Sequence, residues 1–252
     1  MKKTKKIILN LLLLVAIGVF LYSGGRLAHI YYQNYLEKQE RLELQSISKI
    51  PEDITKPFKV DWKALKAKNE DIIAWILVPG TNINYPVVQG PDNAYYLHRT
   101  FEKKDNYAGA IFMDYRVNPA FKDFNTLIYG HNMAHKTMFT DIEKFKEKEF
   151  FDHHDELYIF TPKQNYRGKI FSIYTTNDRS DSYDLNQFDE SDRLAYLDMV
   201  SKKSDFTRKM KFDGNEHIVT LSTCSHEEGI HTDLRLLLHA SLEVWDKEVT
   251  NY

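Results

Sequence analysis

The residues of this chain best suited to covalent chemistry are one cysteine, one histidine and one arginine. Cys224, the only cysteine among 252 residues, follows an alternating apolar segment over residues 217–223. Arg235 lies in the next alternating segment, over 234–244, and a Tyr-Gly-His run ends far upstream at His131. A thiolate is a nucleophile, an imidazole exchanges protons with a thiol and a leaving amine, and a guanidinium stabilises a tetrahedral oxyanion. Together these residue types indicate thiolate acyl transfer.

Strand alternation predicts which of these side chains share a face. Alternate residues of a strand point the same way, so Ser222 and Cys224 lie on one face, and Arg235 and His239 share a face of the next strand. If the two strands pair, Cys224 and Arg235 meet in one groove. The polar segment between them, residues 225–233, suits a surface loop beside a site.

Each of the three residues also has a structural interpretation. A lone cysteine is most often a small, buried hydrophobic residue. His131 is one of ten histidines, and a typical histidine lies at the surface or in a structural hydrogen bond. Arg235 suits an ion pair equally well. Spacing alone therefore leaves the catalytic set as a hypothesis.

No metal and no cofactor is expected. One cysteine excludes both an intramolecular disulfide and a multi-cysteine metal site. His226 and His231 stand close together in the sequence. Two loop histidines without a third placed ligand make a weak metal site, however.

Composition predicts a globular protein whose larger part is acidic. Apolar residues make up 42% and charged residues 28% of the chain, enough for a sizeable core. Residues 1–32 hold five cations and no acidic residue, whereas the whole chain has 34 Lys and Arg against 36 Asp and Glu. No local basic patch stands out in the acidic remainder, which argues against nucleic acid or another polyanion as the main partner.

The N-terminus predicts a membrane anchor. Four lysines precede residues 7–22, which are apolar apart from Asn10. A helix of that length spans roughly 24 Å, so a few more residues would cross a hydrocarbon core of about 30 Å. The positive-inside rule places the lysines in the cytoplasm and the rest of the chain outside. A cleaved signal peptide is the alternative, with residues 23–25 as the nearest cleavage site, but an uncleaved anchor is favoured.

Three parts follow from these patterns: residues 1–30 with the lysines and the anchor, a helical stalk or linker over 31–58, and a folded domain over 59–252. In the folded domain we expect helices over residues 61–69, 138–148 and 190–203. We expect strands over residues 72–78, 83–88, 107–115, 126–129, 157–161, 169–175, 217–223 and 234–244. Many short strands with a few helices predict a mainly β fold, a barrel or a sandwich.

Several of these segments resemble class B sortases. The segments over residues 220–224 and 233–240 resemble the active-site strands of that family, and 127–133 resembles the segment with its catalytic histidine. Residues 74–76, 80–87 and 92–97 resemble its N-terminal barrel region. The likeness runs from about residue 60 to 245 and includes order and spacing.

The resemblance implies a membrane-anchored cysteine transpeptidase of a Gram-positive cell surface. Its fold would be an eight-stranded β-barrel with N-terminal helices and an extra helix before the penultimate strand, over residues 190–203. Cys224 would attack a sorting signal after threonine, with His131 as acid and base and Arg235 holding the substrate and its oxyanion. A cell-wall precursor amine would then take over the surface protein.

The resemblance also implies a groove for the sorting signal, lined by Ser222, Asn93 and Leu97. The chain departs from the family pattern at His226, where an aromatic residue is common, so the substrate preference stays open. Two alternative functions stay open: the first uses the same catalytic residues, and the second uses none of them. One is a hydrolytic cysteine peptidase, and the other is a catalytically inert surface binding module.

Overall fold

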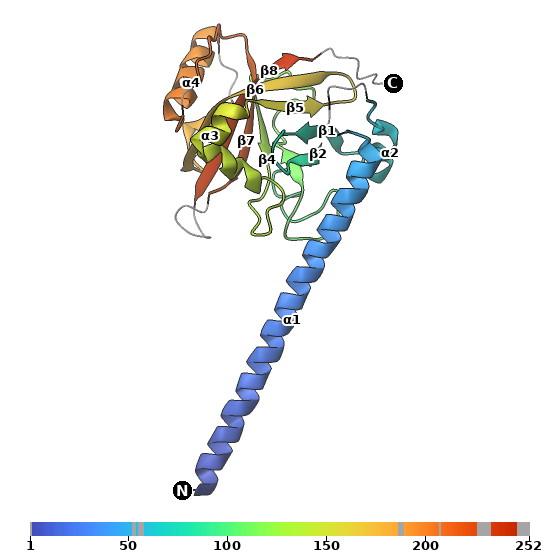
Figure 1. Ribbon diagram of the computed structural model, residues 1–252, viewed down its shortest axis with the longest axis vertical. Coiled ribbons are helices and arrows are strands. Elements are labelled where there is room, and N and C mark those ends of the chain that lie inside the picture. Colours follow the sequence, from blue (N-terminus) through green and yellow to red (C-terminus); the bar gives the residue numbers. More distant parts are fainter. Residues whose placement is uncertain are drawn as a thin grey trace. The chain divides into compact units, whose positions relative to one another are not determined.

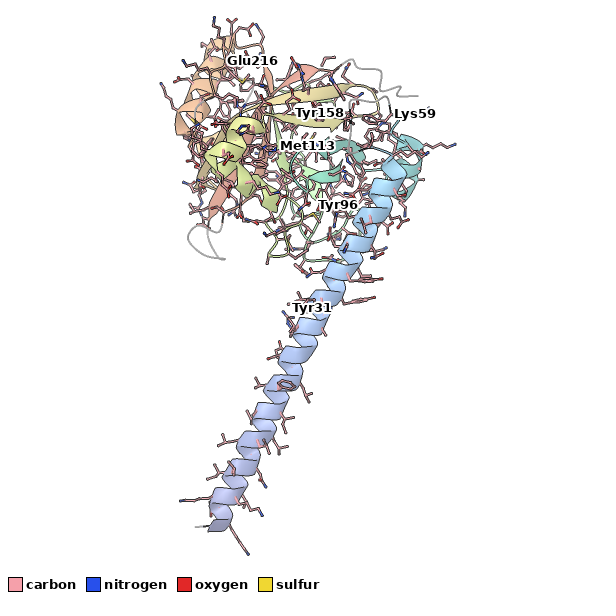
Figure 2. All side chains as sticks on the ribbon, in the orientation of Figure 1. Tyr31, Lys59, Tyr96, Met113, Tyr158 and Glu216 are labelled. Atoms are coloured by element: carbon pink, nitrogen blue, oxygen red, sulfur yellow. The ribbon has the colours of Figure 1, made fainter. Side chains whose placement is uncertain are left out.

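The computed structural model describes residues 2–51, 54, 58–185, 189–206, 208–225 and 233–245. The chain forms two compact units, Met1–Glu40 and Arg41–Tyr252. The first unit is most of a single helix, α1 (Lys2–Ser48), so the expected anchor and the start of the expected stalk are one uninterrupted helix (Figure 1). By length and composition this helix could cross a membrane. Its apolar and aromatic side chains, such as Tyr31, project outward (Figure 2).

The second unit is built around a closed barrel of eight strands. In chain order these are β1 (Ile72–Leu77), β2 (Asn84–Val88), β3 (Ile111–Met113), β4 (Asn125–Tyr129), β5 (Glu156–Phe160), β6 (Asn165–Asn177), β7 (His217–Cys224) and β8 (Leu234–Val244). Around the barrel the order is β1-β2-β3-β4-β7-β8-β6-β5. The pairs β2–β3 and β4–β7 are parallel, and the other pairs are antiparallel. The predicted eight-stranded, mainly β barrel is therefore confirmed (Figure 1).

Apolar side chains fill the barrel because alternate residues of each strand point inward. Ile128 of β4, Leu221 of β7 and Leu238 of β8 are fully buried in this core. Met113 of β3 belongs to the same core (Figure 2). The intervening residues of β4, β7 and β8 face outward, where they are available to covering helices and to a site.

One part of the outer face is covered by α4 (Glu190–Lys203), which lies in the long connection between β6 and β7. Asp189 caps the start of this helix by accepting a hydrogen bond from a backbone N–H of its first turn. The helix buries Leu197 and Val200 in an apolar cluster that includes Ile218 of β7. The helix predicted over residues 190–203, before the penultimate strand, is confirmed.

The helix predicted over residues 138–148 is wrong in its form. That stretch holds a 3-10 helix, η1 (Thr140–Lys146), followed by a separate α-helix, α3 (Lys148–His153). Met138 has a φ of 56°, which an α-helix does not accommodate. Phe139 then precedes η1 without a side-chain cap. A helix starting at residue 138 is therefore excluded by the backbone.

Other expectations differ from the structure mainly in length. The helix expected over 61–69 is α2 (Trp62–Lys68), and its N-cap is Asp61, whose carboxylate accepts from the N–H of Ala64 at 3.1 Å. The strand expected over 107–115 shrinks to β3 because Gly109 makes a turn with a φ of 60°. β6 is longer than expected because its first residues, 165–169, pair with β5 and nearly its whole length, 166–177, pairs with β8.

Candidate active site

The site forms where two parallel strands end at the same edge of the barrel. Parallel strands have their carboxyl ends side by side. Cys224 is the last residue of β7, and His131 follows β4 by two positions. Tyr129 pairs with Ser222, and the N–H of Gly130 continues the pairing by donating to the carbonyl of Ser222 at 3.1 Å. The parallel pair thus brings the distant histidine segment to the cysteine.

The arginine reaches the same edge from the other side of β7. The antiparallel register of β7 and β8 places Cys224 directly opposite Arg235, so the predicted pairing of these two strands is confirmed. The Arg235 guanidinium donates to the carbonyl of Leu234 at 2.9 Å and lies 3.6 Å from the carboxylate of Asp178. Asp178 follows the end of β6, so a residue outside the predicted set helps to orient Arg235.

All six residues named from the sequence line one pocket. The pocket has a volume of about 200 Å³ and mostly apolar walls. Its predicted members are Asn93, Leu97, His131, Ser222, Cys224 and Arg235. Phe112, Tyr129, Gly130 and Thr223 complete the lining. Cys224 is half-buried. A peptide can therefore reach it from the pocket.

The environment of His131 decides which ring atom can exchange a proton. Nε2 lies 2.8 Å from the carbonyl oxygen of Leu97. A carbonyl only accepts, so Nε2 carries the proton and Nδ1 is left for acid–base exchange. Burial lowers the pKa of His131, the hydrogen bond to Leu97 partly opposes it, and His98 lowers it further. The rings of His98 and His131 stack with centroids 5.9 Å apart.

Asn132 connects the histidine segment to the cysteine and was missed by the sequence reasoning. Its Nδ2 donates to the carbonyl of Cys224 at 3.0 Å and to Glu143 at 2.5 Å. Gly130 is needed directly before His131, because a Cβ there would lie 2.7 Å from the ring of Phe139. These contacts fix the backbone on both sides of His131. The position of Asn132 directly after the histidine was the only signal in the sequence.

Tyr183 is a second residue that the sequence reasoning missed. It ends the short 3-10 helix η2 (Asp181–Tyr183) in the connection between β6 and α4. Its hydroxyl lies 2.7 Å from the hydroxyl of Ser222. Burial raises the pKa of Tyr183 to about 12, so the phenol stays protonated at neutral pH. An irregular loop has no periodicity, so no pattern marked this tyrosine.

A buried carboxylate supports the wall of the pocket opposite Tyr183. Asp114, whose side chain is 0% exposed, accepts hydrogen bonds from Asn93 at 2.8 Å and from the Tyr129 hydroxyl at 2.9 Å. Arg116 donates to both oxygens of Asp114 at 2.9 and 2.8 Å. Burial raises the pKa of Asp114, but the hydrogen bonds from Arg116, Asn93 and Tyr129 outweigh it and hold the pKa below its ordinary value.

The structure gives no candidate metal site in the part of the chain that it describes. No group of three or more His, Cys, Asp or Glu side chains there could hold an ion. His226 and His231, the two loop histidines considered from the sequence, lie outside the described residues.

Comparison with known proteins agrees with the fold. The sortase domain family matches residues 76–243. The chain is 34% identical over 234 residues to sortase B of Listeria monocytogenes serovar 1/2a, which covers 90% of this chain and 93% of that protein. Sortase B from Bacillus anthracis in complex with AAEK1 matches with a TM-score of 0.76 at 32% identity, over 86% of this chain and 100% of that one. A Staphylococcus aureus sortase B–substrate complex also has a TM-score of 0.76, at 27% identity over 84% and 99% of the two chains.

Proposed function

Because this chain belongs to the sortase family, among the class B sortases, we propose that it cleaves a C-terminal sorting signal after threonine and transfers the surface protein to a cell-wall amine. Membership makes it a cysteine transpeptidase, and surface proteins with sorting signals are its substrates. One observation carries the proposed roles. The parallel β4–β7 pair and the β7–β8 register bring His131, Cys224 and Arg235 to one pocket.

In the first half of the proposed reaction, the Cys224 thiolate attacks the threonine carbonyl carbon. The carbonyl oxygen becomes an oxyanion, and the Arg235 guanidinium stabilises it by donating hydrogen bonds. The C–N bond then breaks, and Nδ1 of protonated His131 gives its proton to the leaving nitrogen. The product is a thioester between Cys224 and the threonine.

In the second half, the amine of a cell-wall precursor attacks the thioester carbonyl. Nδ1 of His131, now neutral, takes the proton that the amine loses. The C–S bond breaks, a new amide forms, and the thiolate of Cys224 is regenerated with a protonated His131 beside it.

We propose that the sorting signal lies along Asn93, Leu97 and Ser222. These residues line the same pocket as Cys224. Tyr183 and Asp114 hold Ser222 and Asn93 from behind by hydrogen bonds of 2.7 and 2.8 Å. The groove is thereby preorganised on both sides, which reduces the entropy lost when a peptide binds.

We further propose residues 1–30 as cytoplasmic lysines and anchor, 31–58 as stalk or linker, and 59–252 as an extracellular catalytic domain. The length and apolar composition of α1 support crossing of the cytoplasmic membrane through residues 7–22. Sortases are membrane-associated, which agrees with this arrangement. Protease treatment of intact cells tests it, since digestion of the 59–252 region from outside is expected.

The test of the reaction uses the full chain in detergent micelles and sorting peptides of the Asn-Pro-x-Thr-Asn, Ser-Pro-x-Thr-Gly and Leu-Pro-x-Thr-Gly types. Mass spectrometry of the products, with and without an amine acceptor, is expected to show cleavage after threonine and transfer to the amine. Cys224→Ala is expected to lower cleavage by about 10⁴-fold or more. Cleavage that survives in Cys224→Ala, or release of hydrolysed product alone at saturating amine, would contradict the proposal.

A further inference from the structure

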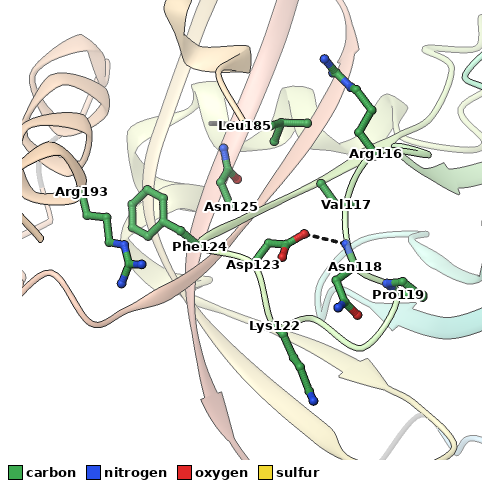
Figure 3. A pocket seen from close by; sticks show the side chains of 10 residues that line it. All are labelled: Arg116, Val117, Asn118, Pro119, Lys122, Asp123, Phe124, Asn125, Leu185 and Arg193. Atoms are coloured by element: carbon green, nitrogen blue, oxygen red, sulfur yellow. Dashed lines mark hydrogen bonds between the residues drawn. The ribbon is translucent and has the colours of Figure 1, made fainter. Parts of the chain in front are cut away.

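A second, larger cavity lies on the same outer face of the barrel as the active-site pocket. It has a volume of about 770 Å³. One wall comes from the β3–β4 connection, including Arg116 and Lys122, and the other comes from the β6–β7 connection, with Leu185 and Arg193 (Figure 3). Asn125, the first residue of β4, lies between the two walls (Figure 3).

The β4–β7 strand pair contributes residues to both cavities and is called their floor below. Asn125 at the start of β4 pairs with Ile218 of β7, and Tyr129 at the end of β4 pairs with Ser222. Asn125 lines the second cavity, whereas Tyr129 and Ser222 line the active-site pocket. The four residue steps from Asn125 to Tyr129 correspond to about 13 Å, so the cavities are consecutive along the β4–β7 pair.

The two cavities also share their walls. On one side Asp114 binds Asn93 of the active-site pocket and Arg116 of the second cavity with the same carboxylate. On the other side Tyr183 contacts Ser222, and Leu185, two residues later, lines the second cavity. A chain that leaves Cys224 along this floor therefore passes from one cavity into the other.

The second cavity is basic, although the chain as a whole has a net charge of −2. Three cations, Arg116, Lys122 and Arg193, line it against one carboxylate, that of Asp123. Asp123 already accepts the backbone N–H of Asn118 at 2.6 Å (Figure 3). The sequence shows no basic patch because these cations come from two connections that are far apart in the chain.

The three cations differ in their contacts and in their exposure. Arg116 is paired with Asp114, but its side chain is still 49% exposed. Arg193 donates to the carbonyl of Gly214 at 3.4 Å, and its guanidinium lies 5.8 Å from the centre of the Phe124 ring. The positive charge of Arg193 also lowers the pKa of Asp189, the N-cap of α4, and Lys122 is exposed.

We propose that the second cavity is an extended subsite for acidic residues that precede the sorting motif in the donor protein. The proposal rests on the proposed function, because it starts from a threonine carbonyl at Cys224. Ile218 precedes Cys224 by six residues of β7, so the two residues are about 20 Å apart along the strand. An extended peptide covers that distance in about six residues, so residues just upstream of a four-residue recognition motif lie over the cavity.

The test compares peptides with one sorting motif and different upstream residues. Each peptide carries two Glu, two Gln or two Lys at the fifth and sixth positions before the cleaved bond, and a short peptide ends at the motif. Cleavage by the full chain is measured without an amine, which isolates donor binding. At low salt the Glu peptide is expected to have a KM about three- to tenfold below that of the Gln peptide, as for partly exposed ion pairs.

Reversing the charge of two cations of the cavity is expected to change the preference from the Glu peptide to the Lys peptide. Lys122→Glu combined with Arg193→Glu is expected to make the Lys peptide the better substrate, each KM being taken relative to that of the short peptide. Lys163→Gln removes an exposed lysine of the β5–β6 turn outside the cavity lining and serves as the control, with the preference for Glu unchanged. Arg116 is left unchanged because it holds Asp114.

Three outcomes would overturn the subsite. The first is equal KM values for the Glu, Gln and Lys peptides while the short peptide is cleaved in a Cys224-dependent way, which leaves the proposed function standing. The second is unchanged KM values in the charge variants together with a changed partition between amine and water once an amine is added, which would assign the cavity to the acceptor. Failure of every peptide to be cleaved would remove the proposed function, and the subsite with it.

Discussion

His131 at the barrel edge near Cys224 and His239 on the outer face beneath α4 have opposite surroundings. His131 lies in a loop after β4, lines a pocket and has one ring nitrogen bonded to a backbone carbonyl. His239 lies within β8, is 0% exposed and has a hydroxyl partner for each ring nitrogen. The first ring keeps a nitrogen for chemistry, and the second has none left.

The polar cluster around His239 connects four strands and a loop. Thr220 of β7 lies 2.9 Å from Nδ1 of His239, and Tyr174 of β6 lies 3.1 Å from its Nε2. Thr220 also donates to Asn125 of β4 at 2.8 Å, and the hydroxyls of Tyr174 and Ser182 lie 2.8 Å apart. Burial lowers the pKa of His239 to about 3, so its ring is neutral at any physiological pH.

The comparison shows that burial and partners, more than residue type, separate an acid–base group from a structural one. Proton exchange needs a nitrogen with access to substrate and a pKa within reach of the working pH. Burial lowers the pKa of both rings, but His131 lines the pocket whereas His239 is 0% exposed. The network at His239 instead holds Ser182, the neighbour of Tyr183, and so supports the wall of the groove.

The strongest way to break this comparison is to replace each histidine in turn. His131→Asn is expected to lower kcat for peptide cleavage by about 10²- to 10⁴-fold, because the leaving nitrogen loses its proton donor. His239→Gln is expected to change kcat by less than about threefold, since no reacting atom touches it. Steady-state kinetics with one sorting peptide checks both variants. Equal losses in the two variants would contradict the distinction.

A smaller effect is expected at Arg235. Arg235→Lys keeps the positive charge but loses the planar fork that can donate to an oxyanion and stay near Asp178. We expect kcat to fall by about 10- to 100-fold, while KM changes less. Arg167→Lys, at a surface ion pair with Glu243 on the barrel, is the matched control. An unchanged kcat in Arg235→Lys would remove the guanidinium from the proposed reaction.

The titration of the two rings sharpens the comparison without changing the fold. The ring resonance that disappears in His131→Asn is expected to titrate below the ordinary histidine midpoint of about 6.5, because burial disfavours its charged form. The resonance that disappears in His239→Gln is expected not to titrate between pH 5 and 8. NMR of histidine-labelled protein measures both. A His131 midpoint above 6.5 would contradict the lowering of its pKa by burial.

His239→Gln is expected to have the smallest effect on activity, but it is expected to change the pH dependence of stability. Its folded pKa is below the unfolded value, so its contribution is complete above about pH 6.5 and is lost as the pH falls toward the folded pKa of about 3. In that window the free energy of unfolding is expected to fall by up to about 1.4 kcal/mol per pH unit from this group. His239→Gln is expected to lose this slope.

Chemical denaturation at several pH values measures the slope at His239. At pH 7 the variant is expected to be about 1–3 kcal/mol less stable, because buried hydroxyls lose a partner. A variant that keeps the full slope below pH 6.5 would mean that other groups, and not His239, dominate the acid response. Cleavage activity measured alongside would confirm that the variant is folded.

Much of the site follows from the sequence because it depends on local order. β7 and β8 are consecutive strands with clear alternation, so the sequence predicts that Cys224 and Arg235 share one face of a pair. The caps at Asp61 and Asp189 lie beside the helices that they start, and a local pattern is enough to find them. The resemblance to class B sortases supplied the choice of His131 among ten histidines.

Only the tertiary structure decided how distant segments meet. The parallel pairing of β4 with β7 brings His131 to Cys224, and no periodicity of either strand encodes its partner. Tyr183 and Asp178 come from irregular connections, where turns and buried hydrogen bonds replace any repeating pattern. The basic cavity likewise exists only because two connections fold over one floor. Alternation and capping are properties of neighbours in sequence, whereas pairing and cavities depend on contacts that form when the barrel closes.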